Sequence, residues 1–365
     1  MTSVPAAQTK GTTAIRVLIA EDSPTSRALL VALFRGASGF EVIGEARNGA
    51  EAIEKTAQLA PDLVIMDVYM PVVDGLDATK VIMREAPTPI VMVSASASAS
   101  DVSMGLSATQ AGALVLLEKP HDPRSASYEG DSTRLIAMAR AMSNVKVVRR
   151  WGTERVARPL DRVKTPTHSM RGEARRARLI AIATSTGGPA ALHRILTDLP
   201  RDLKVPIVIV QHMAQGFIDG LAKWLGGSVG LNVVVAAEGE QLIPGTAYLG
   251  AHDRHLGVSP GGRVLFSDSV PQSGFRPSGD YLFDSCARSY GSGLIAAVLT
   301  GMGNDGVAGL QTVRERGGRV IAQDERSSVV FGMAQQAILS GVVDEVIPLS
   351  AIGTRLAELV EFSQI

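Results

Sequence analysis

The chain has 365 residues, enough for two domains, and its 36 Lys and Arg residues balance its 36 Asp and Glu residues. A chain without net charge has no global attraction to nucleic acid or to an anionic membrane. The one cysteine, Cys286, excludes an internal disulfide framework and suits a reducing compartment, and no apolar run reaches the roughly 20 residues that span a bilayer. We therefore expect a cytoplasmic protein that neither binds nucleic acid nor inserts into a membrane.

The first 140 residues predict a doubly wound α/β domain. Residues 1–13 are small and polar, which predicts a disordered tail rather than a signal peptide. From residue 14 onward, apolar runs typical of buried strands alternate with segments of helix length. The expected strands are 15–20, 41–45, 63–66, 90–93 and 113–117, and the expected helices include 26–35, 50–58, 75–84 and 102–111. This alternation favours a parallel sheet with helices on both faces.

Chemically active side chains stand at the carboxyl ends of these expected strands. Glu21 and Asp22 follow the first strand and Asp67 follows the third, so three carboxylates meet at one edge. Their mutual repulsion favours a bound hard cation, and oxygen ligands suit Mg²⁺. Ser94 ends the fourth strand, and Lys119 follows the fifth, where its ammonium can balance an added phosphoryl group. Each residue alone is compatible with a solvated loop, but the set in this order favours a site.

The same segment carries the motifs IAEDS, DLVIMDVYMPVVDG, MVSAS and EKP. With them, residues 14–140 resemble the receiver domain of bacterial response regulators, which has a flavodoxin-like fold. The resemblance implies that Asp67 accepts a phosphoryl group from a histidine kinase and that Ser94 and Lys119 contact this group. It also implies a Mg²⁺ site formed by the side chains of Glu21, Asp22 and Asp67 and the backbone carbonyl of Tyr69.

Two features depart from the usual receiver pattern. Leu116 stands where receivers usually carry an aromatic residue, and Ala95–Ser100 is a run of small side chains. We expect phosphorylation to be possible, but a readout through an aromatic rotamer is excluded.

Residues 141–177 lose regular patterning and are dominated by Lys and Arg, with Pro159, Pro166 and Gly172 interrupting any long helix. We interpret them as an extended, solvated basic linker. Trp151 among the arginines leaves a nucleic-acid-binding regulator as an alternative, which predicts a strongly salt-dependent affinity for DNA.

Residues 178–365 predict a second α/β domain with a mostly parallel sheet. Apolar runs at 179–183, 205–210 and 294–299 are followed by Ser185, His212 and Asp305. Further strands are expected at 233–236 and 319–322, with a Gly/Pro-rich stretch up to Gly262 and a C-terminal helix at 349–362. Because parallel strands end at one edge, a serine, a histidine and an aspartate are expected to converge there, as in serine hydrolases.

The Gly-rich turn around Ser185 leaves other interpretations open. A serine in such a turn is more often a helix cap, and Thr184 and Thr186 leave the choice of hydroxyl undecided on spacing alone. A phosphate-binding loop is the weaker alternative, because no lysine follows the turn.

Four longer motifs carry a second resemblance: ATSTGGPAAL, IVIVQHMAQGF, LTGMGNDGVAG and AQDERSSVVFGM. They are similar to the catalytic domain of the chemotaxis protein-glutamate methylesterases. The resemblance implies that Ser185 is the nucleophile, His212 the general base and Asp305 the residue that orients His212. It also implies that the Met302 backbone N–H forms the oxyanion hole and that this site needs no cofactor. His255 and Arg276 match substrate-proximal positions more loosely.

Together, the two resemblances imply a phosphorylation-regulated hydrolase that demethylates glutamate γ-methyl esters, and deamidates glutamines, on chemoreceptors. Its implied partners are methyl-accepting chemoreceptors and the histidine kinase of a chemosensory array, and its implied role is adaptation. The rival hypothesis is a phosphorylation-dependent adaptor that binds receptors without turnover.

Overall fold

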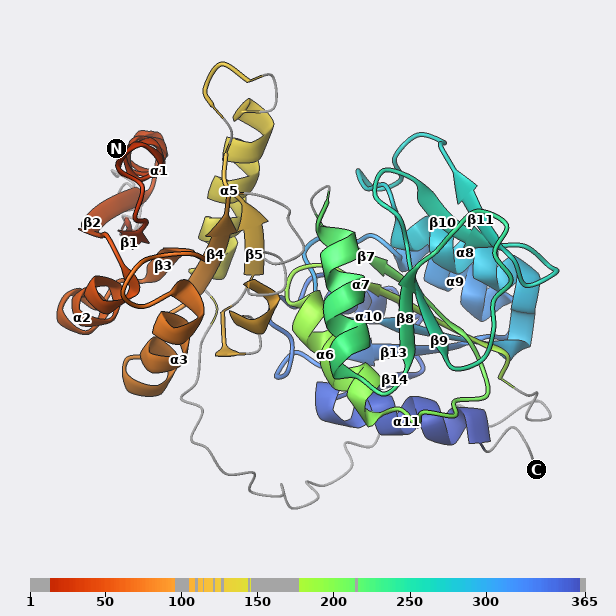
Figure 1. The fold of residues 1–365 in the computed structure, drawn as a ribbon. Coiled ribbons are helices and arrows are strands. Elements are labelled where there is room, and N and C mark those ends of the chain that lie inside the picture. The colour runs from red at the N-terminus through yellow and green to blue at the C-terminus, as the bar shows by residue number, and fades with distance from the viewer. Residues whose placement is uncertain are drawn as a thin grey trace, which may run out of the picture. The chain divides into compact units, whose positions relative to one another are not determined.

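The computed structural model describes residues 14–95, 105–108, 111–113, 115–120, 122–125, 128–143, 145, 177–213 and 216–361. This part of the chain divides into two compact units, one built on a five-stranded sheet and one on a seven-stranded sheet (Figure 1). The predicted tail, and residues 146–176 of the predicted linker, lie outside the described residues, so the domain boundaries remain predictions. Within the described residues, no helix is both long and apolar enough to cross a membrane.

The five-stranded sheet has the order β2-β1-β3-β4-β5, with parallel pairing of β1 to β2, β1 to β3 and β3 to β4. Its strands are β1 (Ile15–Ala20), β2 (Phe40–Ala46), β3 (Leu63–Asp67), β4 (Ile90–Ser94) and β5 (Val115–Glu118). Its helices include α1 (Pro24–Gly36), α2 (Gly49–Leu59), α3 (Gly75–Glu85) and α5 (Tyr128–Met142). This order is flavodoxin-like, which confirms the predicted fold. Of the helix expected at 102–111, the described residues 105–108 are helical.

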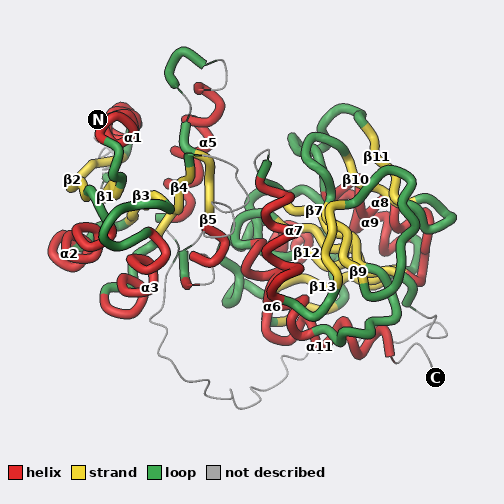
Figure 2. The backbone as a smooth tube through the Cα atoms, viewed as in Figure 1, coloured by secondary structure: helices red, strands yellow, loops and turns green. Residues whose placement is uncertain are grey.

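The seven-stranded sheet is parallel throughout, in the order β14-β13-β12-β6-β7-β9-β8. Its strands are β6 (Leu179–Thr184), β7 (Ile207–Gln211), β8 (Asn232–Val235), β9 (Thr246–Leu249), β12 (Leu294–Val298), β13 (Arg319–Gln323) and β14 (Glu345–Ile347). A separate antiparallel hairpin is formed by β10 (His255–Val258) and β11 (Val264–Ser267) (Figure 2). The stretch interpreted from sequence as Gly/Pro-rich therefore contains β9 and β10, which the sequence analysis did not predict.

The helices of this unit are α6 (Gly188–Asp198), α7 (Phe217–Ser228), α8 (Gly279–Tyr290), α9 (Val307–Glu315), α10 (Met333–Leu339) and α11 (Leu349–Glu361). Helix α6 packs against α7 and α11, whereas α8 packs against α9 and against β6 (Figure 1). Leu179, Ala181 and Ala183 of β6 share one core with Leu282 and Phe283 of α8. Burial on both faces explains why β6 is an unbroken apolar run.

Strand β6 lies where the strand order reverses. The chain passes from β6 to β7 on one side, and β12 later pairs with β6 on the other side. In open α/β sheets, ligands bind at the carboxyl ends of the strands at such a switch point. A site in this sheet is therefore expected at the carboxyl ends of β6, β7 and β12.

Candidate active site and receiver edge

The turn after β6 separates Ser185 from the two threonines that flank it. The Thr184 hydroxyl is buried and donates to the Thr300 carbonyl at 2.9 Å, and Thr186 is also buried. Ser185 is half-buried, and its backbone N–H donates to the same Thr300 carbonyl at 3.0 Å. The chain then turns through Gly187, whose φ of 80° lies in the left-handed region that favours glycine. Of the three hydroxyls, the geometry favours Ser185 as the accessible one.

His212 and Asp305 meet although they are 93 residues apart. The His212 Nε2 atom lies 2.9 Å from Asp305 Oδ2, at the ends of β7 and of the segment after β12. Because an ionised carboxylate can only accept, this contact fixes the imidazole hydrogen on Nε2. The Phe275 ring lies flat against the imidazole, with ring centroids 4.0 Å apart and an interplanar angle of 2°. The imidazole is thus held by a hydrogen bond at one nitrogen and by stacking on its face.

The N-terminus of α8 holds Asp305. Its carboxylate accepts from the Ser278 hydroxyl at 2.6 Å and from the backbone N–H groups of Gly279 at 2.6 Å and Asp280 at 3.2 Å. Burial alone would raise the pKa of Asp305, but the hydrogen bonds from His212, Ser278 and Gly279 outweigh burial and lower that pKa below its usual 3.8. A helix N-terminus also favours a negative charge. Asp305 therefore stays ionised at neutral pH.

Ser185 lies beside Gly301, the residue before Met302. A Cβ added to Gly301 would lie 2.8 Å from the Ser185 Cβ, so only glycine fits there. Among the described residues, neither the Met302 backbone N–H nor the His212 Nδ1 atom has a hydrogen-bond partner. The structure thus brings together Ser185, His212, Asp305 and the Met302 peptide at one sheet edge, although it forms no hydrogen bond between the Ser185 hydroxyl and Nδ1.

Two other predicted residues have different surroundings. His255 is fully buried in β10, its Nε2 lies 3.1 Å from the Val270 carbonyl, and its ring stacks on Tyr281. Its side chain has no exposed surface and packs within the domain, and its substrate-proximal position remains a prediction. Arg276 is partly exposed, and its guanidinium donates to Asp253 at 2.8 Å. It therefore braces the loop that carries the neighbouring Phe275.

The acidic edge of the five-stranded sheet also assembles as predicted. One carboxylate oxygen from each of Glu21, Asp22 and Asp67 lies within 4.8 Å of the others. The Lys119 ammonium lies 2.7 Å from Glu21 and 2.9 Å from Asp67. Burial, followed by the charge of Asp67, raises the pKa of Glu21 from 4.5 to about 7, against the opposing effect of Lys119. Three convergent carboxylates fit a hard divalent cation such as Mg²⁺.

Neighbouring groups complete this edge. Ser94 is buried at the end of β4, and the Tyr69 backbone N–H donates to the Asp67 carboxylate. Burial raises the pKa of Asp67 although Lys119 opposes it. Leu116 is buried against Gly105, where an added Cβ would lie 2.6 Å from the leucine side chain. Of the small-residue run 95–100, only Ala95 belongs to the described residues.

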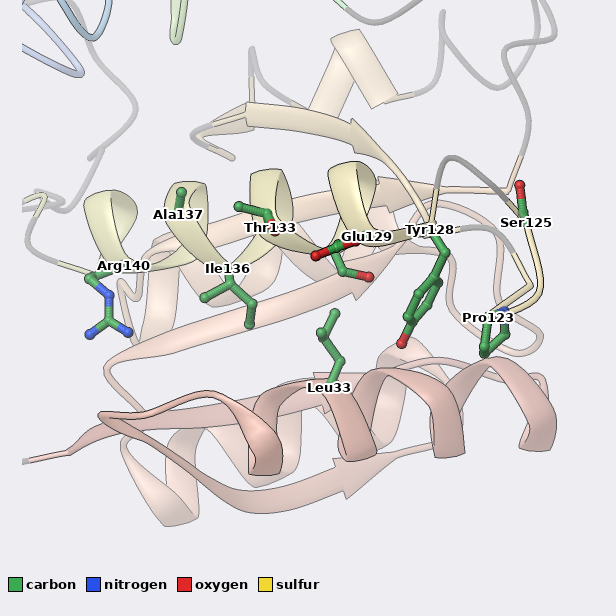
Figure 3. A pocket seen from close by; sticks show the side chains of 10 residues that line it. Leu33, Pro123, Ser125, Tyr128, Glu129, Thr133, Ile136, Ala137 and Arg140 are labelled. Carbon is green, nitrogen blue, oxygen red and sulfur yellow. The ribbon is translucent and has the colours of Figure 1, made fainter.

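A groove of about 810 Å³ lies elsewhere, between α1 and α5. Figure 3 shows Leu33, Tyr128 and Ile136 projecting into it from the two helices. Its lining includes none of the acidic-edge residues, so we assign it no part in either site.

Sequence reasoning missed three residues that contact Ser185, His212 or Asp305, namely Ser278, Phe275 and Gln211. The Ser278-Gly279-Asp280 order is a recognisable N-cap signal, but nothing in it indicates that the helix N-terminus faces Asp305. Phe275 is one aromatic residue in a loop, and its stacking on His212 depends on tertiary structure alone.

The two folds and their edges are those of a receiver-linked protein whose second unit brings a serine, a histidine and an aspartate to one sheet edge. A family model described as a response regulator receiver domain matches residues 17–126, and one described as CheB methylesterase matches residues 180–356. The chain therefore belongs to the CheB methylesterase family, with an N-terminal receiver domain.

Full-length relatives support this assignment. The chain is 47% identical over 342 residues to protein-glutamate methylesterase/protein-glutamine glutaminase 4 of Myxococcus xanthus (strain DK1622), covering 94% of this chain and 96% of that one. It is 45% identical over 344 residues to the corresponding protein 3 of Anaeromyxobacter dehalogenans (strain 2CP-C), covering 94% and 98%. The crystal structure of the Thermotoga maritima CheB methylesterase catalytic domain matches 50% of this chain and 99% of that chain, with 41% identity and a TM-score of 0.49.

Proposed function

We propose that this chain is a protein-glutamate methylesterase and protein-glutamine glutaminase that acts on methyl-accepting chemoreceptors in the cytoplasm. The observation that carries the proposal is the His212–Asp305 pair, 2.9 Å apart at the sheet edge that also carries Ser185. Relatives that match nearly the whole chain are named protein-glutamate methylesterase/protein-glutamine glutaminase, which supports the choice of substrate.

The ring geometry indicates which nitrogen acts as the base. With the imidazole hydrogen on Nε2 and donated to Asp305, the lone pair lies on Nδ1. We propose that Nδ1 takes the Ser185 proton as the hydroxyl oxygen attacks the ester carbonyl. The imidazolium returns this proton to the departing methoxide, and methanol leaves. Water then hydrolyses the acyl-enzyme and releases glutamate. A glutamine amide reacts along the same path and releases ammonia.

The oxyanion of each tetrahedral intermediate needs hydrogen-bond donors that have no other acceptor in the protein. The Met302 N–H has no acceptor among the described residues and follows Gly301, which contacts Ser185. We propose that this N–H stabilises the oxyanion. The ionised Asp305 balances the positive charge that His212 gains in the same step.

We propose that a histidine kinase of a chemosensory array controls the activity by phosphorylating Asp67. Mg²⁺, when bound by Glu21, Asp22, Asp67 and the Tyr69 carbonyl, would neutralise charge on the phosphoryl group. Lys119 already contacts the Asp67 carboxylate and is the group that would pair with the added phosphate, with Ser94 as a hydroxyl donor.

The nucleophile assignment is tested by methanol release from methylated receptor cytoplasmic fragments. Ser185→Ala should lower the rate by about 10⁴–10⁶-fold, because the remaining groups cannot form the acyl-enzyme. The matched control is Ser228→Ala, which removes a serine hydroxyl that bonds only carbonyls of α7 and should leave the rate unchanged. Turnover retained by Ser185→Ala would overturn the mechanism. Receptor binding by the wild-type protein without turnover would instead support the adaptor hypothesis.

A further inference from the structure

Gln211, the last residue of β7, contacts the peptides of both the nucleophile and the base. Its side chain is buried, and its Nε2 donates to the Ser185 carbonyl and to the His212 carbonyl, each at 2.9 Å. An amide NH₂ group has two hydrogens, so each carbonyl can receive one. A single side chain therefore joins the two residues between which the proposed proton transfer takes place.

This amide extends the sheet beyond its last backbone pairing. Strands β6 and β7 pair as far as Thr184 and Gln211, and the His212 N–H still donates to the Thr184 carbonyl at 3.1 Å. Past that point, the Gln211 side chain supplies the next hydrogen bonds, to the Ser185 carbonyl after β6 and to the His212 carbonyl after β7. The spacing between Ser185 and His212 thus depends on this side chain as well as on the backbone ladder.

The orientation of the Gln211 amide leaves its oxygen atom without a hydrogen bond from any described residue. The Gln211 Oε1 atom is buried and has no hydrogen-bond partner within the described part of the chain. It lies against Gly188, where an added Cβ would come within 1.9 Å of it. This contact explains why the second glycine of the turn is required. An orientation that leaves an acceptor unsatisfied is poorly explained by stability alone.

We infer that Gln211 is a positioning residue that sets the distance and angle between the Ser185 hydroxyl and His212 Nδ1. This inference deepens the proposed function and rests on it. A base must lie within hydrogen-bond reach of the proton it removes, and displacements of about 1 Å can cost about 100-fold in rate. The amide touches no reacting atom, so its effect should appear in kcat rather than in KM.

The first test compares two glutamines whose amides each donate to two backbone carbonyls in the full-length protein. Gln211→Met keeps the side-chain length but removes both donors, and it should lower kcat for methanol release by about 10–100-fold with KM unchanged. Gln241→Met is the matched control, since the Gln241 amide also donates to two backbone carbonyls, those of Gly261 at 3.4 Å and Gly262 at 2.9 Å, and bonds no residue of the candidate site. Both variants should lose stability, but the control should keep kcat within about threefold of the wild type. Equal losses of kcat in both variants would overturn the inference.

The second test uses Gln211→Glu, which preserves size and can regain one donor on protonation. Its kcat relative to the wild type should rise as the pH falls, because a protonated carboxyl donates to one of the two carbonyls. A ratio that stays constant with pH would contradict a donor role. A merely structural role would change melting temperature without this pH dependence.

A substrate-independent readout separates this inference from the proposed function. A fluorophosphonate probe labels an activated serine without any receptor, and Gln211→Met should slow the labelling of Ser185 by a similar 10–100-fold. A normal labelling rate in Gln211→Met would overturn the positioning role. If the wild-type protein is labelled but releases no methanol from receptors, the proposed substrate is wrong, and the labelling rates still decide the role of Gln211.

Discussion

Single residues set the protonation state of each site. Asp305 is buried, and four hydrogen bonds from His212, Ser278, Gly279 and Asp280 hold its charge. Because its pKa is lower in the folded state than the usual 3.8, ionised Asp305 stabilises the fold at neutral pH. That contribution is present above the pKa that Asp305 has in the unfolded state. It is lost as the pH falls through the lower pKa that Asp305 has in the folded state.

Ser278→Ala tests this anchoring. Removing the 2.6 Å donor should lower the free energy of unfolding at pH 7 by about 1–3 kcal/mol and should also lower kcat. The difference from the wild type should shrink in acid, once Asp305 is protonated in both proteins. Urea unfolding at pH 7 and at a series of lower pH values measures this, and a difference that stays constant as the pH falls would contradict the account.

Glu21 behaves in the opposite way, because burial and Asp67 raise its pKa to about 7. Without a divalent cation, neutral Glu21 stabilises the receiver fold fully at a pH below 4.5, the pKa of this side chain in the unfolded chain. This contribution is lost as the pH rises through the folded-state pKa of about 7. Mg²⁺ binding requires the ionised form, so affinity should rise about tenfold between pH 6 and pH 8. Calorimetric Mg²⁺ titrations measure this dependence. Glu21→Gln should flatten it, and a flat profile in the wild type would refute the ligand assignment.

At the scale of elements, close contacts between turns and strands position both sites. Gly75, the first residue of α3, lies against β3 so closely that an added Cβ would be 2.1 Å from the Asp67 carbonyl oxygen. Helix α3 therefore begins directly against the end of β3, and no larger residue fits between them.

Gly75→Ala should destabilise the receiver by about 3 kcal/mol, because a backbone atom must move to relieve the clash. The matched control is Gly36→Ala at the end of α1, where an added Cβ meets nothing within 4 Å. That change should be neutral or stabilising by up to about 1 kcal/mol. Urea unfolding of both variants decides the matter, and equal effects would contradict the assigned role of Gly75.

The elements nearest the sites were the most predictable from sequence. Strands β1, β3, β4, β6, β7 and β12 are buried on both faces, and such strands read as continuous apolar runs. The short strands β9, β10, β11 and β14 were missed. Their identity depends on pairing partners rather than on local pattern.

The surroundings of a predicted site residue were likewise predictable only where the strand beside it was recognised from the sequence. Glu21, Asp67, His212 and Asp305 were found because each follows a recognisable strand, and the parallel sheet brings such ends together. His255 also belongs to a strand, but to a hairpin that the sequence analysis did not recognise, so its burial was not foreseen. Gln211 carries no motif signal beyond its place before His212.

At the scale of the whole molecule, a receiver domain and a methylesterase domain share one chain, which couples phosphorylation to ester hydrolysis. To shift an inhibited state from 1:99 to 99:1, phosphorylation must favour the active state by about 5.5 kcal/mol. Leu116 supplies no aromatic ring to report a phosphoryl group, so phosphorylation control would need a readout at another position.

The most direct measurement is methanol release from methylated receptor fragments by the full-length protein, with and without Mg²⁺ and a small phosphodonor. We predict release that rises with the donor, that loses this rise in Asp67→Asn, and that disappears in Ser185→Ala. Release that is the same with and without the donor would contradict phosphorylation control. Release that survives in Ser185→Ala would contradict the serine mechanism itself.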